Sequence, residues 1–302
     1  MDARKLVAIV NPAAGDGAVG ERLQSIRQAL TGGFAAGVYQ TLRPGHAEEW
    51  ARTFSNAPGF LVIGGDGTVH EVLTGMNTAT QSLAVLPSGT SNSLGRDLGL
   101  PDLAATLDAV AEGRTEPVDV VQATFRDAKG GKRSCVVGAT LALGFPVRAA
   151  GVARHLGRGW SAMPGPLATF LGAVGVPAFT ATVRADGARA KRRRMTGLLV
   201  GATRHAGNLV PFPRASLTDG KFDVMEMNAG VVGQSLHTAS LFTRGSWWKP
   251  ASQGQAKRLS VVLTRPAPLM IDGELYPAIK ALDVSIRSRQ LALYVPRGLH
   301  PA

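Results

Sequence analysis

Short apolar runs alternate with amphipathic stretches through the first 120 residues. Runs of this length predict buried strands, and the spacing of Val69, Val72, Leu73 and Met76 predicts a helix directly after one of them. Strands that alternate with helices indicate an α/β domain with a parallel sheet. The pattern predicts strands at 6–10, 37–41, 60–63 and 82–86, and helices at 21–30 and 101–113.

The pattern changes to strands and turns after Pro117–Val120, where a new strand is predicted. Gly130-Gly131 and Asp186-Gly187 lie between strand-like runs, as hairpin turns do. We therefore predict two domains, an α/β nucleotide-binding domain and a β-rich domain of β-sandwich type. The predicted boundaries are 1–118 for the first domain, completed by 290–302, and 119–289 for the second.

Residues 159–183 contain no charged side chain, which raises the question of a membrane span. Pro164, Pro166 and Pro177 interrupt the stretch and disfavour a continuous apolar helix of about 20 residues. A helix at 167–174 and a strand at 179–183 explain it better. A lipid-facing wall made by this stretch remains an alternative.

Charge is distributed unevenly along the chain. Residues 1–120 hold 8 Lys and Arg against 13 Asp and Glu, whereas residues 121–302 hold 25 against 8. The change supports a domain boundary near residue 120 and a basic surface on the second domain. Anionic lipid headgroups and nucleic acid both suit such a surface. The densest run is Lys191–Arg194, and a solvated face is the plainer explanation of it.

One cysteine, Cys135, excludes an internal disulfide and suits a reducing compartment. The first apolar run, Leu6–Val10, is too short for a signal peptide. These features predict a cytoplasmic protein.

The segment Gly64-Gly65-Asp66-Gly67-Thr68 follows the strand predicted at 60–63 and begins a helix. Unpaired N–H groups at such a helix start can hold a phosphate in the space that the glycines leave. Asp66 repels phosphate on its own, so it indicates a divalent cation or a donor hydroxyl beside it. A plain turn with a capping aspartate is the alternative.

Two further turns follow predicted strands of the same sheet. Asn11 opens the loop after the first strand, and Pro87–Ser93 forms a glycine- and hydroxyl-rich turn after 82–86. The loop also spells GxGxxG at Gly15, Gly17 and Gly20, but no acidic residue follows where a dinucleotide ribose requires one. We interpret that match as accidental and the loop as a turn close to the phosphates.

Gly64–Thr68 resembles the nucleotide-binding signature shared by diacylglycerol kinases, sphingosine and ceramide kinases, and NAD kinases. The resemblance implies that ATP is bound along this motif and its neighbours. The implied nucleotide-binding residues are Asn11, Thr41, Gly64, Gly65, Asp66, Gly67, Thr68, Val69, His70, Glu71, Ser88, Gly89 and Thr90.

The second glycine turn resembles the PxGTxND motif of the lipid kinases, with Ser93 in place of the final aspartate. That aspartate belongs to a polar network around the metal in bacterial members, so the network differs here. Sphingosine kinases also lack this acid and share the pair His70-Glu71. These two positions slightly favour ceramide or a sphingoid base as the acceptor lipid, with diacylglycerol as the alternative.

Two segments of the second domain complete the resemblance. Pro213–Val224 resembles PxAxxxDGxLDV, which implies a structural Mg²⁺ held by Asp219 and by the backbone carbonyls of Ser216 and Lys221. Asp272-Gly273-Glu274 resembles the DGE motif, which implies that Glu274 is the general base. A hairpin turn is the plainer explanation of Asp272-Gly273, since Asp-Gly is a strong turn signal. If a strand continues through the motif instead, Asp272 shares a face with Glu274 and could replace it. Asp66 is a second rival, since sphingosine kinases are thought to use that aspartate as base.

Together these features predict an ATP- and Mg²⁺-dependent kinase of a lipid primary hydroxyl, with Glu274 and Asp66 as catalytic residues. The expected partners are the lipid substrate and an anionic membrane surface, bound peripherally. Nucleic acid is not favoured, and a homodimer is left open. NAD kinase is the enzymatic alternative, and a non-catalytic binder of anionic lipid or nucleic acid is the alternative of another class.

Overall fold

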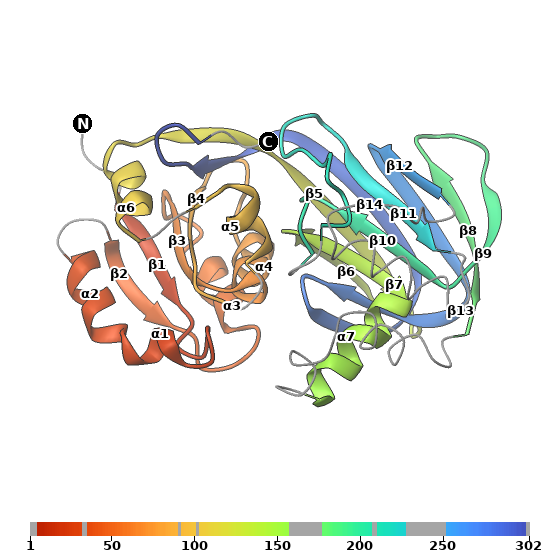
Figure 1. Ribbon diagram of the computed structural model, residues 1–302, viewed down its shortest axis with the longest axis horizontal. Coiled ribbons are helices and arrows are strands. Elements are labelled where there is room, and N and C mark those ends of the chain that lie inside the picture. Colours follow the sequence, from red (N-terminus) through yellow and green to blue (C-terminus); the bar gives the residue numbers. More distant parts are fainter. Residues whose placement is uncertain are drawn as a thin grey trace.

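The computed structural model describes residues 5–31, 35–89, 92–100, 103–156, 177–206, 210–227 and 252–299. It has an α/β domain, on the left in Figure 1, and a strand-rich domain on the right. This arrangement matches the predicted fold class. The helix predicted at 167–174 lies outside the described residues.

The α/β domain alternates strands and helices in the order that the sequence pattern predicts. Its elements are β1 (Leu6–Val10), α1 (Ala18–Glu21), α2 (Leu23–Thr31), β2 (Ala35–Gln40), α3 (His46–Thr53), β3 (Gly59–Gly64), α4 (Asp66–Gly75), β4 (Ser82–Pro87), α5 (Ser93–Asp97) and α6 (Leu103–Ala111). The strands pair in parallel in the order β4, β3, β1, β2.

Alternate residues of each central strand pack on opposite faces of this sheet. Phe60 and Val62 of β3 belong to the cluster that includes residues of α3, α4 and α5. Leu61 and Ile63 belong to the cluster that includes residues of α1, α2 and α6. Because both faces are covered, these strands appear in the sequence as continuous apolar runs rather than as alternating ones.

The strand order reverses direction between β1 and β3, since β1 is followed by β2 on one side and by β3 on the other. Ligands of open α/β sheets bind outside the carboxyl ends of the strands at such a switch point. The loops that follow β1 and β3 therefore flank the expected ligand position. These are the loops that carry Asn11 and Gly64–Thr68.

The strand-rich domain contains ten strands and one helix in the described ranges. They are β5 (Thr115–Asp127), β6 (Lys132–Val137), β7 (Thr140–Gly144), α7 (Phe145–Leu156), β8 (Phe179–Ala185), β9 (Lys191–Met195), β10 (Gly197–Gly201), β11 (Phe222–Met227), β12 (Ser252–Ala256), β13 (Arg258–Ile271) and β14 (Glu274–Tyr294). The predicted strand at 179–183 and both predicted hairpin turns are confirmed.

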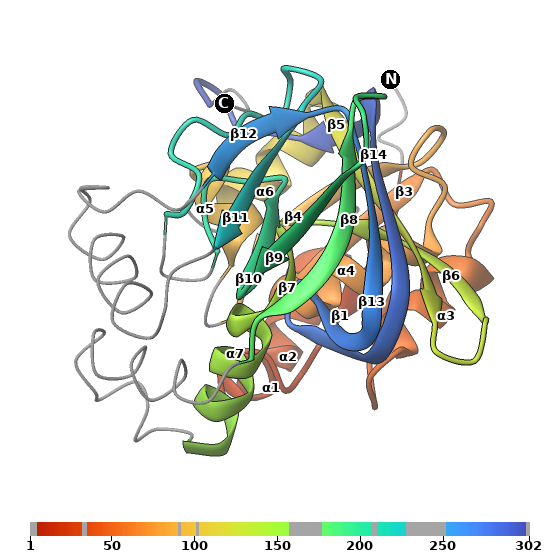
Figure 2. The ribbon, with the colours of Figure 1, turned by 90° about the vertical axis from the view of Figure 1, so that its right-hand side faces the viewer.

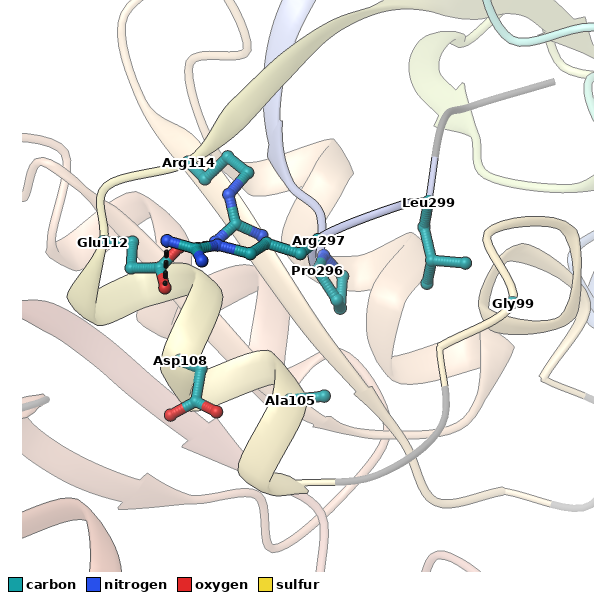
Figure 3. Close-up of a pocket in the computed structure, with 8 residues that line it drawn as sticks. All are labelled: Gly99, Ala105, Asp108, Glu112, Arg114, Pro296, Arg297 and Leu299. Carbon is teal, nitrogen blue, oxygen red and sulfur yellow. Dashed lines mark ion pairs between the residues drawn. The ribbon is translucent and has the colours of Figure 1, made fainter.

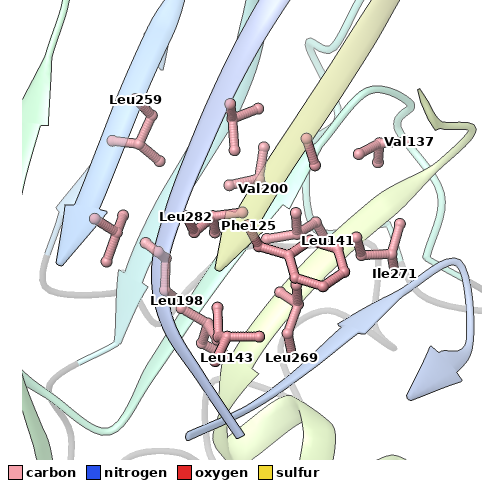
Figure 4. Packing of buried hydrophobic residues seen from close by; sticks show 14 of the residues in the cluster. Phe125, Val137, Leu141, Leu143, Leu198, Val200, Leu259, Leu269, Ile271 and Leu282 are labelled. Atoms are coloured by element: carbon pink, nitrogen blue, oxygen red, sulfur yellow. The ribbon is translucent and has the colours of Figure 1, made fainter. Parts of the chain in front are cut away.

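The core of this domain lies between strands of two layers (Figure 4). Phe125 of β5 and Leu282 of β14 pack with Leu141 of β7 and Val200 of β10 in one buried cluster. Strand β13 reaches both layers, because its first part pairs with β8 and its last part pairs with β7. Its register against β14 shifts between Val262 and Ala267, as a bulge that bends a strand does.

Two long strands join the domains. Strand β5 pairs with β14 along both halves of the molecule, and the end of β14 pairs in parallel with β4 (Figures 1 and 2). The end of the chain therefore returns to the first domain, although as part of one 21-residue strand rather than a separate one. The domain boundaries themselves stay a prediction.

The basic run Lys191–Arg194 forms β9, which pairs only with β8 among the described strands. All four side chains are exposed. Within the described part of the chain, no helix has the length and apolarity that crossing a bilayer requires.

Candidate active site

Three loops at the carboxyl ends of β1, β3 and β4 are held together by hydrogen bonds. The Asn11 backbone N–H donates to the carbonyl of Ile63 at 2.9 Å, and its amide Nδ2 donates to Thr68 Oγ1 at 3.0 Å. The Ser88 N–H donates to the carbonyl of Gly64 at 2.9 Å. Asn11, Gly64, Thr68 and Ser88 thus lie in one place, as the resemblance implies. Thr41 lies beside them, because its N–H donates to the carbonyl of Val10.

The two glycine turns touch backbone to backbone. A Cβ on Gly89 would lie 2.5 Å from the Cα of Gly65, and a Cβ on Gly65 would lie 3.1 Å from the Cα of Gly89. Gly15 is also close, since a Cβ there would lie 2.8 Å from the carbonyl oxygen of Ser88. The loop after β1 therefore belongs to the same site. Thr90 lies outside the described residues.

Asp66 begins α4 and points at the start of α5. Its Oδ1 accepts from the Ser93 N–H at 2.7 Å, and its Oδ2 accepts from the Ser93 hydroxyl at 3.0 Å. Burial raises the pKa of the Asp66 carboxyl, the carboxylate of Asp272 raises it further, and the bonds from Ser93 only partly offset this. Ser93, which replaces the family aspartate, is thus a donor to Asp66.

Several residues after the motif are used inside the protein. Val69 is buried in the core, and the Glu71 carboxylate accepts from the N–H groups of Gly45 and Ala47 at 2.7 and 2.9 Å, at the start of α3. His70 is 2% exposed and bonds to Asp272 and Tyr276. The side chains of these three residues point to internal partners. That these three residues bind the nucleotide remains a prediction.

Asp272 and Gly273 form the hairpin turn between β13 and β14, with φ of 49° and 91°. The Asp272 carboxylate accepts from the N–H groups of Gly138, Ala139 and Thr140 at 2.7 to 2.8 Å. It also pairs with His70 Nδ1 at 3.0 Å. The strand does not continue through the motif, because the chain turns at Asp272 and Gly273. The condition under which Asp272 would share a face with Glu274 is therefore not met, and the Asp272 carboxylate accepts from donors inside the protein.

Glu274 lies directly after this turn, at the start of β14, and is half-buried. A Cβ on Gly67 would lie 3.5 Å from Glu274 Oε1, so the carboxylate faces the first turn of α4. The strand-rich domain thus brings one carboxylate against the motif that the α/β domain provides.

Comparison with known proteins agrees with this geometry. Residues 5–123 match the model of the diacylglycerol kinase catalytic domain. The chain is 27% identical over 283 residues to the diacylglycerol kinase of Bacillus subtilis, covering 88% of each chain, and 26% identical over 278 residues to that of Staphylococcus carnosus, covering 88% and 87%. Residues 5–123 form a diacylglycerol kinase catalytic domain. This confirms the predicted lipid kinase class of enzyme.

Solved structures agree on the fold of this chain. A diacylglycerol kinase from Bacillus anthracis superposes with a TM-score of 0.74 at 21% identity over 97% of both chains. An NAD kinase from Archaeoglobus fulgidus in complex with ATP superposes with a TM-score of 0.53 at 14% identity, over 96% of this chain and 94% of that one. At these identities the likeness concerns the fold alone.

The residues implied to hold Mg²⁺ lie on one tight turn before β11. Lys221 N–H donates to Asp219 Oδ1 at 2.9 Å, and Gly220 N–H donates to Asp119 Oδ2 at 2.6 Å, so the turn is fixed from both sides. Gln255 Nε2 lies 3.3 Å from the other oxygen of Asp219. Oxygen ligands of this kind suit Mg²⁺. That Asp219 holds the ion with the carbonyls of Ser216 and Lys221 stays a prediction.

The kinase also has a pocket away from these residues. A pocket of about 460 Å³ lies between α6 and the C-terminal segment, and none of its lining residues belongs to the predicted site (Figure 3). It is lined by Gly99, Ala105, Asp108, Glu112, Arg114, Pro296, Arg297 and Leu299. In the ranges that the structure describes, no three His, Cys, Asp or Glu side chains are grouped as metal ligands.

The first prediction concerns the contact between the glycine turns. Gly89→Ala should weaken ATP binding by at least about 10-fold, because its methyl group meets backbone rather than a movable side chain and the phosphate loops must separate by a sizeable fraction of 1 Å. Calorimetric titration with ATP measures this. Gly151→Ala is the control, since a Cβ there meets nothing within 4 Å. Unchanged affinity of the Gly89 variant would contradict the contact.

The second prediction concerns the hairpin turn. Asp272→Ala leaves four donors without their acceptor, at about 1–3 kcal/mol for each buried group that finds no water. We expect the free energy of unfolding in urea to fall by at least about 3 kcal/mol. Glu274→Ala, at a half-buried position, should change it far less. Equal stability of the two variants would remove the structural role of Asp272.

Proposed function

We propose that this protein transfers the γ-phosphoryl group of ATP to the primary hydroxyl of diacylglycerol, with Glu274 as general base. The observation that carries the proposal is the position of the Glu274 carboxylate against Gly67 of the phosphate motif. The full-length relatives named diacylglycerol kinase support this acceptor.

The predicted slight preference for ceramide or a sphingoid base as the acceptor lipid is not supported. It rested on Ser93 and on His70-Glu71, and each of these side chains has a partner within the protein. The Ser93 hydroxyl donates to Asp66, His70 pairs with Asp272, and Glu71 caps α3. Nothing in these contacts favours one acceptor lipid over another.

Phosphoryl transfer depends on positioning and on charge neutralisation more than on covalent chemistry. The N–H groups in the first turn of α4 have no intrahelical acceptors and can hold phosphate oxygens. Bound with ATP, Mg²⁺ would neutralise phosphate charge beside Asp66. Glu274 accepts the proton of the lipid hydroxyl while the new O–P bond forms and the bond to the bridging oxygen of ADP breaks.

The acceptor is tested by product analysis. ATP labelled in the γ position is offered with diacylglycerol, ceramide, sphingosine and NAD in parallel, and labelled products are separated by thin-layer chromatography. We expect label in phosphatidic acid. Label in NADP or in a sphingolipid instead would replace the proposed acceptor, and no labelled product at all would favour a non-catalytic binder of the same fold.

The third prediction separates the two candidate bases. Glu274→Gln should lower kcat by at least about 10²-fold with little change in ATP affinity, because the amide accepts no proton. Asp66→Asn should instead disturb both kcat and ATP affinity. If Glu274→Gln turns over normally while Asp66→Asn binds ATP well and is inactive, then Asp66 is the base.

The thermal stability of Asp66→Asn is the control for its predicted loss of activity. Since the folded protein raises the pKa of Asp66, its ionised form disfavours folding at neutral pH, and this penalty is lost as the pH falls below the raised value. Asp66→Asn should therefore melt at the wild-type temperature or above at pH 7. Near-wild-type activity in this variant would remove Asp66 from the mechanism.

We also propose that the enzyme docks peripherally on anionic membranes through the exposed basic strand β9. The support is its four consecutive cationic side chains at the edge of the strand-rich domain. Each such charge near an anionic bilayer contributes about 1 kcal/mol. Arg193 also lies 3.8 Å from Glu226, a contact that neutralises part of this charge.

The fourth prediction tests this surface. Replacing Lys191, Arg192, Arg193 and Arg194 with serine should weaken binding to phosphatidylserine vesicles, and wild-type binding should fall steeply with salt, because charges are screened beyond about 8 Å at physiological ionic strength. Activity on a short lipid dispersed in detergent should not change. The control removes four exposed charges elsewhere, at Arg126, Lys129, Lys132 and Lys280. Equal loss of binding in both variants would contradict docking by β9.

A further inference from the structure

His70 connects the nucleotide motif to both sides of Glu274. It lies one helical turn after Asp66 on α4 and is 2% exposed. Its Nδ1 is 3.0 Å from Asp272 Oδ2, and its Nε2 is 3.2 Å from the hydroxyl of Tyr276. Asp272 and Tyr276 flank Glu274 in the chain, so a single imidazole fixes the backbone before and after the base.

Both contacts of His70 are well defined. Asp272 is a fixed acceptor, since three backbone N–H groups hold its carboxylate. Tyr276 is held by ring contacts with Phe125 and with the guanidinium of Arg133. Burial raises the pKa of Tyr276, so its hydroxyl stays protonated and can donate to Nε2 or accept from it. The two bonds can therefore persist whether His70 is neutral or charged.

We propose that His70 is a positioning residue that holds Glu274 in register with the phosphate motif, chiefly through Asp272. The inference rests on the proposed function of Glu274 as base. A displacement of a reacting group by about 1 Å costs on the order of 10²-fold in rate. The bond to a carboxylate is the stronger of the two contacts, because hydrogen bonds to charged groups are about twice as strong as neutral ones.

Two substitutions divide the roles of the ring nitrogens. In His70→Asn the amide nitrogen takes the place of Nδ1 and can donate to Asp272, whereas in His70→Gln it reaches the place of Nε2 and can bond to Tyr276. We expect kcat to stay within about threefold of wild type in His70→Asn and to fall by at least about 10-fold in His70→Gln. KM for ATP should stay within about twofold in both. Tyr276→Phe, which keeps the ring, should resemble His70→Asn.

A double-mutant cycle tests whether His70 acts through Glu274. If it does, His70→Gln should have little further effect on kcat once Glu274→Gln is present, because the group that it positions is gone. Equal fold losses in both backgrounds, or wild-type kcat in His70→Gln, would overturn the inference. Normal turnover of Glu274→Gln alone would overturn the base assignment and the inference with it, whereas an inactive Glu274 variant beside a fully active His70→Gln overturns the inference only.

The pH profile of His70→Asn keeps the inference testable should His70→Gln fail to fold. Burial lowers the pKa of His70, but the bond and charge of Asp272 raise it by more, to above its usual 6.5. The charged groups that act on the ring are Asp272, in the turn before β14, and Glu274, the first residue of β14. Tyr276 bonds to Nε2, and Arg133 of β6 and Glu48 of α3 act on Tyr276.

The sign of the effect follows from the imidazolium charge, which strengthens the bond to Asp272. This added strength is complete below the usual pKa of His70 and is lost as the pH rises through the raised value, when the neutral ring keeps only the weaker bond. Wild-type kcat should therefore decline on the alkaline side of that value, by up to about threefold. His70→Asn has no titrating ring and should show no such decline. The same alkaline decline in both proteins would overturn the inference.

Discussion

The turn at Asp272 is the contact on which the arrangement of the site depends. A carboxylate removed from water is unfavourable unless donors replace the water, and here three consecutive N–H groups of residues 138–140 do so. The fourth partner, His70, comes from the other domain. One buried charge therefore fixes the loop before β7, the start of β14 and helix α4 relative to one another.

Much of this fold could be predicted from the sequence. The apolar runs of β1, β3 and β4 and the glycine turns after them are local patterns, so they place the phosphate motif at the carboxyl edge of a parallel sheet. Asp-Gly is likewise a strong local turn signal at Asp272-Gly273. The alternative in which Asp272 shares a face with Glu274 required a strand that continues through the motif, and the chain turns there instead.

The partners of the polar side chains could not be predicted in the same way. His70 and Asp272 are 202 residues apart, and Ser93 and Asp66 are 27 apart. Neither pair has a spacing that a helix or strand imposes. Glu71, on the next position of α4, points to α3 instead of the site. A motif thus shows which residues gather near a ligand, but the direction of each side chain follows from packing.

Strand β14 explains how Glu274 of one domain is kept in register with the glycine motif of the other. It begins with Glu274, pairs with β5 across the junction, and ends beside β4, whose own carboxyl end leads to Ser88 and Gly89. Glu274 and the second glycine turn are therefore connected through a hydrogen-bonded sheet rather than through a flexible linker. Such a connection restrains the backbone of Glu274 at long range, and the Asp272 turn with His70 restrains it locally.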